Sequence, residues 1–213
     1  MRRREFVQVT ATTLAGASLA GRVTGRQEDE DMPQGERGPV RVGIVGCGPG
    51  THGEVWARML ASPDGAHLGM VPTKVWDADA DTARALAEEC GTEAVATHLE
   101  AGEDVDGVLI TELLPERYLE LSRPFLERGM KVFYNRPFAG SIADAKEICR
   151  LAKEHGAPVY SASALYHTEA GAAARESLKE WSPVRLFTMT GPTDHIVFYL
   201  PHAIAALVSV LGT

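Results

Sequence analysis

The sequence lacks the clusters of basic residues with which proteins bind nucleic acids. Its 21 Lys and Arg residues are outnumbered by 29 Asp and Glu residues, so the formal net charge is -8 at pH 7. Because contact with phosphate backbones requires a basic surface, this balance argues against a nucleic-acid partner. The 213 residues, of which 45% are hydrophobic and 23% charged, have the composition of a soluble globular protein with one large or two small domains.

Cysteine is also scarce, and the few cysteines present are far apart. They are Cys47, Cys90 and Cys149. An odd, widely spaced set implies neither a disulfide framework nor a C-x-x-C metal site, and we interpret these residues as small buried apolar side chains. Histidine pairs with the i, i+3 or i, i+4 spacing of a helical metal site are not found among His167, His195 and His202. We therefore expect no metal site.

The first 20 residues have the features of an export signal. Arg3 and Arg4 precede Glu5-Phe6-Val7 in the manner of a twin-arginine signal, and a weakly apolar stretch then runs to Ala20. We expect cleavage after Ala20 and a periplasmic or extracytoplasmic location. Because a membrane span needs about 20 mainly apolar residues, we expect no stable membrane span. The alternative is a basic, disordered N-terminus. Residues 21–38 have the polar, acidic composition of a disordered linker.

The stretch from Val40 to Gly53 predicts a strand, a tight turn and the start of a helix. Val40–Val45 is an apolar run without helical period, and the glycines after it allow backbone angles that other residues avoid. The helix that follows has Val55, Trp56, Met59 and Leu60 on one face. At such a turn a pyrophosphate can lie against the backbone at a helix N-terminus, where free N–H groups and the helix dipole favour an anion.

The turn matches the dinucleotide fingerprint G-x-G-x-x-G in part. Its first two glycines are Gly46 and Gly48, the third position is Thr51, and Gly50 and Gly53 lie beside it. A threonine is accommodated there if the helix packs slightly farther from the strand. We predict that Gly46, Gly48 and Gly50 hold the pyrophosphate; the alternative is an ordinary glycine-rich turn.

A second predicted strand, Thr73–Trp76, ends at an aspartate. Asp77 is the best candidate for the acidic residue that accepts the ribose hydroxyls, and its carboxylate would repel a 2'-phosphate, so NAD is favoured over NADP. The interval from Gly46 to Asp77 exceeds the usual spacing of about 20 residues, which we attribute to an inserted loop over residues 61–72. The alternative is that Asp77 or Asp79 only caps the next helix.

Strands and helices continue to alternate after Asp77, with glycines at helix ends. This order predicts an α/β fold of the Rossmann type, with a doubly wound parallel sheet covered on both faces. Ligands bind beyond the carboxyl ends of such strands, where the glycine turn, Asp77 and Thr111 would gather. The further predicted helices are Ala80–Cys90, Glu116–Arg128 and one opening at Ser141, and the further predicted strands are Val105–Thr111, Lys131–Tyr134 and Pro158–Ala162.

Several motifs in this order resemble the Gfo/Idh/MocA family, which includes glucose-fructose oxidoreductase and inositol dehydrogenase. The resemblance runs from about Val40 to Gly212. It implies a domain over residues 39–160 that binds NAD or NADP, and a second α+β domain over 161–213 that is incomplete here. It also implies hydride transfer to or from a sugar- or polyol-like substrate. The motifs are VGIVGCGPG, DGVLITELLPERYLEL, GMKVFYNRPFAGSIADAKEICRLAKEHG and HAIAALVSVLG.

The family's Glu-Lys-Pro segment falls on Asn135, Arg136 and Pro137, and its proton-transfer His falls on His202. The resemblance therefore implies that Arg136 faces the substrate or the nicotinamide, that Pro137 lies in the cofactor site and that His202 moves the proton. An arginine keeps the positive charge of the family's Lys, but its pKa above about 12 bars it from proton exchange. For His202 the alternative is a packed residue on an apolar helix.

Other family positions also differ in this chain. The Asp that precedes the family's His falls on Phe198 and a later acidic residue on Ala205, while Asp194 and His195 lie nearby in sequence. Tyr118 replaces a family His and either lines the nicotinamide pocket or fills the core.

The part of the second domain that is present predicts one strand and leaves it without a sheet. Val184–Thr190 alternates as a strand, which leaves an uncovered strand edge and an apolar face. We expect either that a partner, such as a second copy, covers this surface or that the chain is a fragment or a truncated reading frame. Three functions stay open: an NAD(P)-dependent oxidoreductase, a dinucleotide-binding module or truncated pseudoenzyme without turnover, and a structural protein that binds no nucleotide.

Overall fold

The computed structural model describes residues 38–180, 184–190 and 196–212. Within it the chain divides into two compact units, with the boundary between Ser161 and Ala162. The export signal predicted over residues 1–20, nearly all of the predicted linker, and Asp194 and His195 lie outside the described residues.

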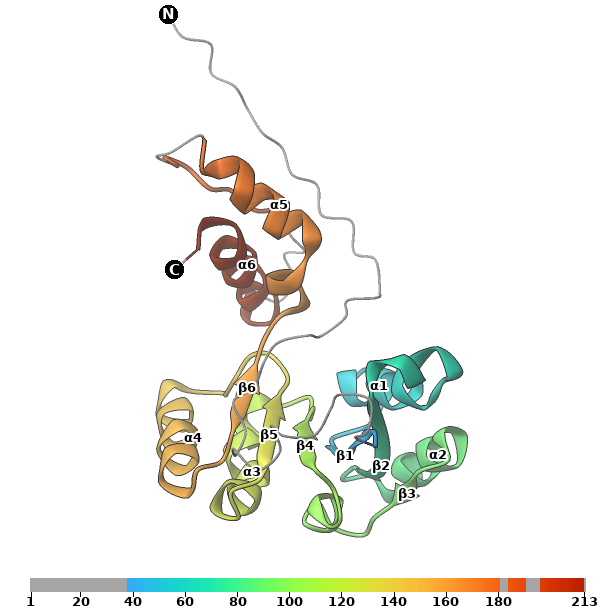
Figure 1. Ribbon diagram of the computed structural model, residues 1–213. Helices are drawn as coiled ribbons and strands as arrows, with labels where there is room; N and C mark the ends of the chain where they lie inside the picture. The colour runs from blue at the N-terminus through green and yellow to red at the C-terminus, as the bar shows by residue number, and fades with distance from the viewer. Residues whose placement is uncertain (1–37, 181–183, 191–195, 213) are drawn as a thin grey trace, which may run out of the picture. The chain divides into compact units, whose positions relative to one another are not determined.

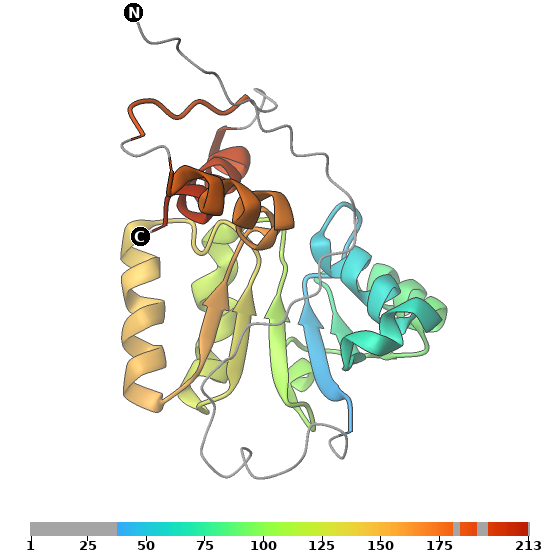
Figure 2. The ribbon, with the colours of Figure 1, turned by 45° about the horizontal axis from the view of Figure 1, so that its top comes forward.

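The N-terminal unit is built on a six-stranded sheet of order β3-β2-β1-β4-β5-β6 (Figure 1). All of its neighbouring strands pair in parallel, and the arrows in Figure 2 point the same way. The doubly wound parallel sheet predicted from the alternation of elements is thus confirmed. The strands are β1 (Val40–Val45), β2 (Met70–Trp76), β3 (Glu93–Ala94), β4 (Gly107–Ile110), β5 (Lys131–Tyr134) and β6 (Val159–Ser161).

Helices cover both faces of this sheet. Alternate residues of a strand point to opposite faces, so Leu109 packs with α1 and α2 while Val108 and Ile110 pack with α3 and α4. All four residues of β4 are buried, as expected for a central parallel strand. The helices are α1 (His52–Ala61), α2 (Ala80–Cys90), α3 (Tyr118–Glu127) and α4 (Ile142–His155), with short 3-10 segments η1 (Pro63–Leu68), η2 (Glu100–Gly102) and η3 (Pro115–Arg117).

Local sequence sets the ends of α2 and α4. The side chain of Asp79 accepts hydrogen bonds from the first backbone N–H groups of α2, and Ser141 does the same for α4. Both helices end at a glycine in the left-handed region, Gly91 with φ 65° and Gly156 with φ 66°. These stops agree with the glycine positions predicted from the sequence.

For the segment after the glycine turn, one expectation is wrong, and the apolar face predicted for α1 is buried only in part. Residues 61–72 are not an inserted loop, because they contain η1 and the first residues of β2, which pairs with β1 from Val40 onward. Val55 and Met59 are 55% and 43% exposed, whereas Gly53, Ala57 and Leu60 form the buried side of α1. Gly53 and Ala57 are small, so the helix can approach the sheet closely there.

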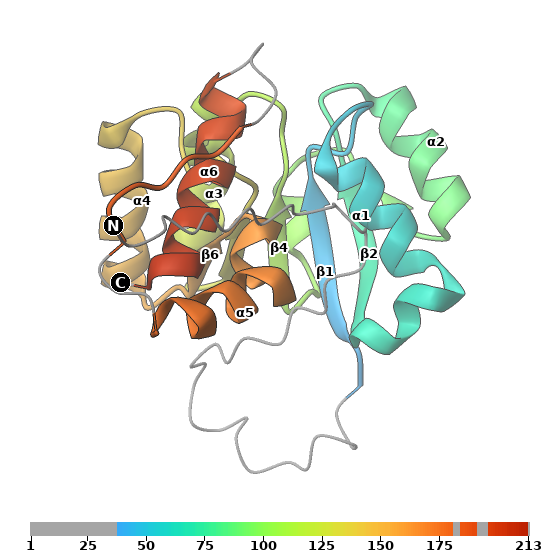
Figure 3. The same ribbon diagram turned by 90° about the horizontal axis from the view of Figure 1, so that it is seen from above.

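The C-terminal unit contains η4 (Ala164–His167), α5 (Glu169–Leu178) and α6 (Ile196–Leu211). Helices α5 and α6 lie side by side (Figure 3), and the guanidinium of Arg175 donates to the backbone oxygens of Val208 and Ser209 at 3.0 and 2.8 Å. The strand predicted over Val184–Thr190 is wrong: these residues form no strand. An alternating pattern forms a strand only where another strand pairs with it, and no described residues pair with this segment.

Among the described residues, none of the helices has both the length and the apolar character needed to cross a membrane.

Candidate functional site

The carboxyl ends of four neighbouring strands meet at one edge of the sheet. In its register the last residues of β2, β1, β4 and β5 lie opposite one another. The side chains and turns that come next are therefore brought together, although they are distant in sequence. The residues that follow these strand ends are Gly46, Asp77, Thr111 and Asn135.

The glycine turn is fastened to both neighbouring strands. Gly46 has φ +89°, and its N–H donates to the backbone oxygen of Trp76 at 2.8 Å. The buried hydroxyl of Thr111 donates to the backbone oxygen of Gly46 at 2.6 Å. A Cβ atom on Gly46 would lie 2.3 Å from the backbone nitrogen of Glu112. Gly46 is thus required by backbone angle and by space, and Thr111 supports the turn.

The next two glycines leave the outer side of the turn bare. The φ of Gly48 lies outside the left-handed region, and a Cβ atom there would stand 2.9 Å from Oδ2 of Asp77. Gly50 has φ +81°, and a Cβ atom on it would meet nothing within 4 Å. Both positions are therefore free of side chains; Gly48 is buried, whereas Pro49 and Gly50 are exposed.

Thr51 caps α1, and the close approach of the helix is made by another residue. The Thr51 hydroxyl oxygen accepts from the N–H of Glu54 at 3.2 Å, and its O–H donates to the backbone oxygen of Gly48 at 2.7 Å. A Cβ atom on Gly53 would lie 2.3 Å from the oxygen of Gly46 and 2.4 Å from Oγ1 of Thr111. The expectation that the helix packs farther from the strand is wrong, because Gly53 supplies the contact that the fingerprint assigns to its third glycine.

Replacing Thr51 by alanine should lower the free energy of unfolding by about 1 kcal/mol, the usual cost of losing an N-cap. Thr51→Ser keeps the hydroxyl and should stay within about 0.5 kcal/mol of the wild type. Urea unfolding followed by circular dichroism measures both variants. Equal stability of the alanine and serine variants would contradict the capping role.

Asp77 and Asp79 have different roles. Oδ2 of Asp77 accepts from the N–H of Cys47 at 3.0 Å, and its Oδ1 accepts from the N–H of Asp79 at 3.0 Å. Asp79, by contrast, caps α2. Asp77 therefore lies beside the glycine turn and does not cap the helix. Burial and the nearby Asp77 carboxylate raise the pKa of the Cys47 thiol to about 12, so this cysteine is an inert, buried side chain. The same interpretation is wrong for Cys149, which is exposed, and Cys90 is half-buried.

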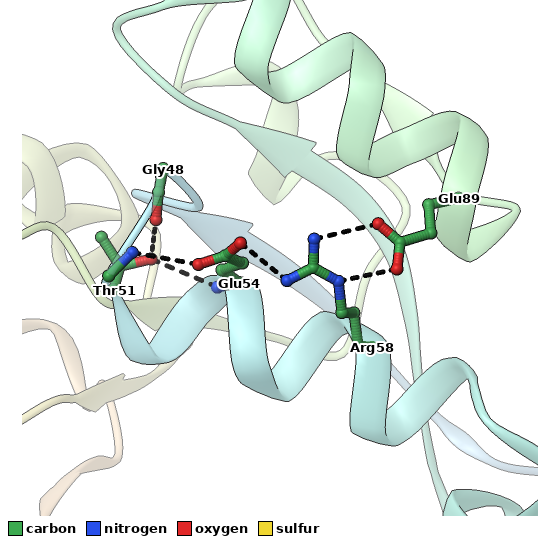
Figure 4. Close-up of polar contacts among 6 residues, drawn as sticks. Gly48, Thr51, Glu54, Arg58 and Glu89 are labelled. Carbon is green, nitrogen blue, oxygen red and sulfur yellow. Dashed lines mark hydrogen bonds and ion pairs between the residues drawn. The ribbon is translucent and has the colours of Figure 1, made fainter.

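Glu54 connects the glycine turn to α2 through Arg58 (Figure 4). Its Oε2 accepts from the N–H of Gly50 at 3.0 Å, and its Oε1 accepts from Nη1 of Arg58 at 2.6 Å. Arg58 also donates from Nε and Nη2 to the two carboxylate oxygens of Glu89, at 2.7 and 3.0 Å. The hydrogen bond from Arg58 lowers the pKa of the Glu54 carboxyl, which is therefore ionised at neutral pH.

The role of Glu54 was not predicted, although the sequence carries a signal for it. Thr51 and Glu54 have the spacing of a capping box, in which a glutamate three residues after the N-cap reaches back to the turn. Here it reaches Gly50 rather than the N-cap itself. Glu54, Arg58 and Glu89 also line a hollow of about 220 Å³ between α1 and α2.

At the end of β5, Asn135 and Arg136 face a histidine that the sequence did not single out. His52 is the first residue of α1, and its Nδ1 lies 3.1 Å from Nδ2 of Asn135. Its Nε2 lies 3.4 Å from Nη2 of Arg136. Burial, and then the charge of Arg136, lower the pKa of His52. Pro137 follows through a cis peptide bond and is half-buried.

Tyr118 is a core residue. It is 1% exposed, its ring lies 6.1 Å from that of Tyr134, and its hydroxyl donates to the backbone oxygen of Glu112 at 3.0 Å. Burial raises its pKa. Of the two interpretations of this position, the aromatic that fills the core is confirmed.

His202 belongs to the C-terminal unit, where it lies on α6. Its Nδ1 is 2.5 Å from the hydroxyl oxygen of Ser163, which also accepts from the N–H of Leu165 at 3.2 Å. His202 is thus hydrogen-bonded and half-buried. Across the described ranges, no three His, Cys, Asp or Glu side chains are grouped so that they could hold a metal ion.

A family model described as an oxidoreductase family with an NAD-binding Rossmann fold matches residues 40–163. Among curated proteins, none matches this chain. The match to the family model includes the glycine turn, all six strands and the segment that contains Asn135, Arg136 and Pro137.

Solved structures share the fold at low sequence identity. A protein from Desulfitobacterium hafniense named as an NADPH-dependent oxidoreductase has a TM-score of 0.59 and 20% identity, over 68% of this chain and 41% of that one. A UDP-N-acetylglucosamine 3-dehydrogenase from Acidithiobacillus ferrooxidans has a TM-score of 0.52 and 18% identity, over 67% and 42%. A mutant 3-ketoreductase from Actinomadura kijaniata, in complex with NADP and TDP-benzene, has a TM-score of 0.55 and 22% identity, over 67% and 44%.

The chain spans less than half of the length of these solved relatives. The model match, in contrast, covers more than half of this chain and coincides with the sheet and the glycine turn. This chain therefore belongs to the Gfo/Idh/MocA family of oxidoreductases, whose N-terminal part is an NAD-binding Rossmann fold.

Proposed function

We propose that this protein is an NAD(P)-dependent oxidoreductase that transfers a hydride between a nicotinamide cofactor and a sugar- or polyol-like substrate. The observation that carries this proposal is the glycine turn at the N-terminus of α1, in which Gly48 and Gly50 carry no side chains and Asp77 lies beside Gly48. When bound, the nicotinamide ring would supply the hydride donor or acceptor.

The residues of the turn fit a dinucleotide. The N-terminus of α1 offers N–H groups and the positive end of a helix dipole to a pyrophosphate, and neither Gly48 nor Gly50 carries a side chain that would block it. Asp77 would accept hydrogen bonds from the ribose hydroxyls. Its negative charge disfavours a 2'-phosphate, which supports a preference for NAD.

Arg136 and His202 would act on the substrate. Arg136 carries a permanent positive charge at the end of β5 and can orient a substrate oxygen, but it exchanges no proton. His202 can carry the proton, because an imidazole is able to change charge near neutral pH. The sugar-like substrate class is supported by two solved relatives, a dehydrogenase of UDP-N-acetylglucosamine and a 3-ketoreductase. We also propose export through the N-terminal signal and association between copies.

Titration with NADH and NADPH tests the cofactor proposal. The full chain should bind NADH more tightly than NADPH, and Asp77→Asn should weaken NADH binding by about 10- to 150-fold, because a charge-assisted hydrogen bond contributes about 1.5–3 kcal/mol. Asp77→Asn should also reduce the ratio of the affinity for NADH to the affinity for NADPH. Binding is followed by quenching of tryptophan fluorescence and energy transfer to the reduced nicotinamide.

Asp79→Asn is the matched control, since Asp79 caps α2 and its hydrogen bond to Asp77 is made by the backbone N–H, which the substitution keeps. It should leave the ratio of the two affinities unchanged. A folded chain that binds neither NADH nor NADPH would overturn the proposal and leave the third function, a Rossmann fold that serves as a scaffold.

A dinucleotide-binding module without turnover is the second candidate. It is favoured by Arg136, which replaces a residue able to exchange protons, and by Phe198 in the place of the family's Asp. Tight NADH binding without hydride transfer to any member of a panel of sugars, polyols and sugar nucleotides would select it.

A further inference from the structure

His52 lies between the glycine turn and the segment that contains Arg136. It is the residue directly after the N-cap Thr51, and it is half-buried against the end of β5. One ring nitrogen faces the side-chain amide of Asn135 at 3.1 Å and the other faces the guanidinium of Arg136 at 3.4 Å. Its ring also contacts that of Trp56, one turn along α1, at 5.7 Å between centroids.

Hydrogen-bond chemistry selects one protonation state of this ring. A guanidinium has donors only, so Nε2 must be bare if it is to accept from Arg136. A neutral imidazole then carries its proton on Nδ1, and the amide of Asn135 can turn its oxygen toward that N–H because an amide has both a donor and an acceptor. A protonated imidazole has two donors and would face Arg136 with a second positive charge.

We propose that His52 is a positioning residue whose neutral imidazole holds Arg136 and Asn135 at the carboxyl end of β5, and whose protonation releases them. This inference rests on the proposed function, in which Arg136 orients the substrate. It assigns no proton transfer to His52. The consequence is that the site assembles only while this histidine is neutral.

The surroundings of His52 favour its neutral form. Arg136 faces it from the end of β5, and the positive end of the α1 dipole lies beneath it. Asn135 and Trp56 are uncharged, and the carboxylate of Glu54, on the same helical turn, is bonded to Gly50 and Arg58. Because burial and Arg136 lower its pKa from 6.5, His52 stays neutral above that pH and becomes protonated only below it.

The catalytic test compares two substitutions of His52 in the full chain. His52→Gln keeps an acceptor for Arg136 but cannot be protonated, so it should retain most of kcat/KM at pH 7.5. The fall of kcat/KM below pH 6.5 should be smaller in this variant than in the wild type, because the contribution of His52 is removed. His52→Leu removes the acceptor and should lower kcat/KM at pH 7.5 by about 10- to 100-fold, as expected for a misplaced orienting group. NADH binding, which shows that each variant is folded, should change by less than about threefold.

His98→Gln serves as a matched control. His98 is also partly buried with a lowered pKa, but its ring packs between Trp76 and Phe125, and its substitution should leave the pH profile unchanged. Any decline of kcat/KM at low pH that His202 causes should be the same in the wild type and in all of these variants. If His52→Leu shows the rate and the pH profile of the wild type, His52 does not position Arg136.

A second measurement needs neither cofactor nor substrate. The ring nitrogens of ¹⁵N-labelled histidine report the tautomer and pKa of His52 by NMR, and Arg136→Gln should raise that pKa because it removes the facing charge. If no substrate is ever turned over, this shift alone still supports the contact while the proposed function fails. A His52 that titrates at its ordinary pKa and ignores Arg136→Gln would overturn the inference.

Discussion

Replacing Gly53 by alanine should lower the free energy of unfolding of the N-terminal unit by about 3 kcal/mol, the upper part of the range for overpacking a filled site. The new methyl group would stand 2.3 Å from the backbone oxygen of Gly46 and 2.4 Å from Oγ1 of Thr111. Neither atom can move freely, because Thr111 is buried and bonded to Gly46. Helix α1 would have to withdraw from the strand. Urea unfolding followed by circular dichroism measures the change.

Gly50→Ala is the control for this prediction. It adds the same methyl group in the same turn, but into open space, so its cost is the left-handed backbone conformation alone, about 1–2 kcal/mol. Gly53→Ala should therefore be clearly less stable than Gly50→Ala. Equal stabilities would mean that α1 does not depend on a close approach at Gly53.

Gly48→Val should weaken NADH binding by about 100-fold or more, which corresponds to about 2.7 kcal/mol. Its side chain would fill the space through which a pyrophosphate reaches the backbone. It would also press on Asp77, whose Oδ2 lies 2.9 Å from the position of the new Cβ. The fold should survive, because the φ of Gly48 lies outside the left-handed region and the nearest atom belongs to a side chain rather than to the backbone. Fluorescence titration measures the affinity.

Gly38→Val is the matched control, since Gly38 is exposed and a Cβ atom there would meet nothing within 4 Å. Its NADH affinity should equal that of the wild type. A Gly48→Val protein that is folded and binds NADH within threefold of the wild type would show that the cofactor does not use this turn.

Gly48 and Gly53 show how much of the candidate site can be predicted from the sequence. The apolar run before Gly46, the glycines and the later alternation of strands and helices are local patterns, and they predicted the turn and the parallel sheet. The fingerprint, however, assigns close packing to the position of Thr51, whereas the structure uses Gly53 for it. Which small residue faces the strand depends on where α1 begins, and the helix begins after Thr51 because its hydroxyl caps the first turn.

Contacts between segments that are far apart in the chain could not be predicted from the sequence. His52 meets Asn135 and Arg136 only because the register of β1, β4 and β5 brings the strand ends together. No spacing rule connects residues so far apart. The prediction of a strand over Val184–Thr190 is wrong for the opposite reason. Its local pattern is typical of a strand, but no neighbouring strand is present among the described residues.

The contact between Glu54 and the N–H of Gly50 has a consequence for dinucleotide binding at this turn. The amide already carries a negatively charged partner, so a phosphate oxygen that takes this position replaces one anion by another. The displaced carboxylate stays attached to Arg58, which also grips Glu89 near the far end of α2. Glu54, Arg58 and Glu89 thus form a chain of three charged side chains that connects the glycine turn to the neighbouring helix.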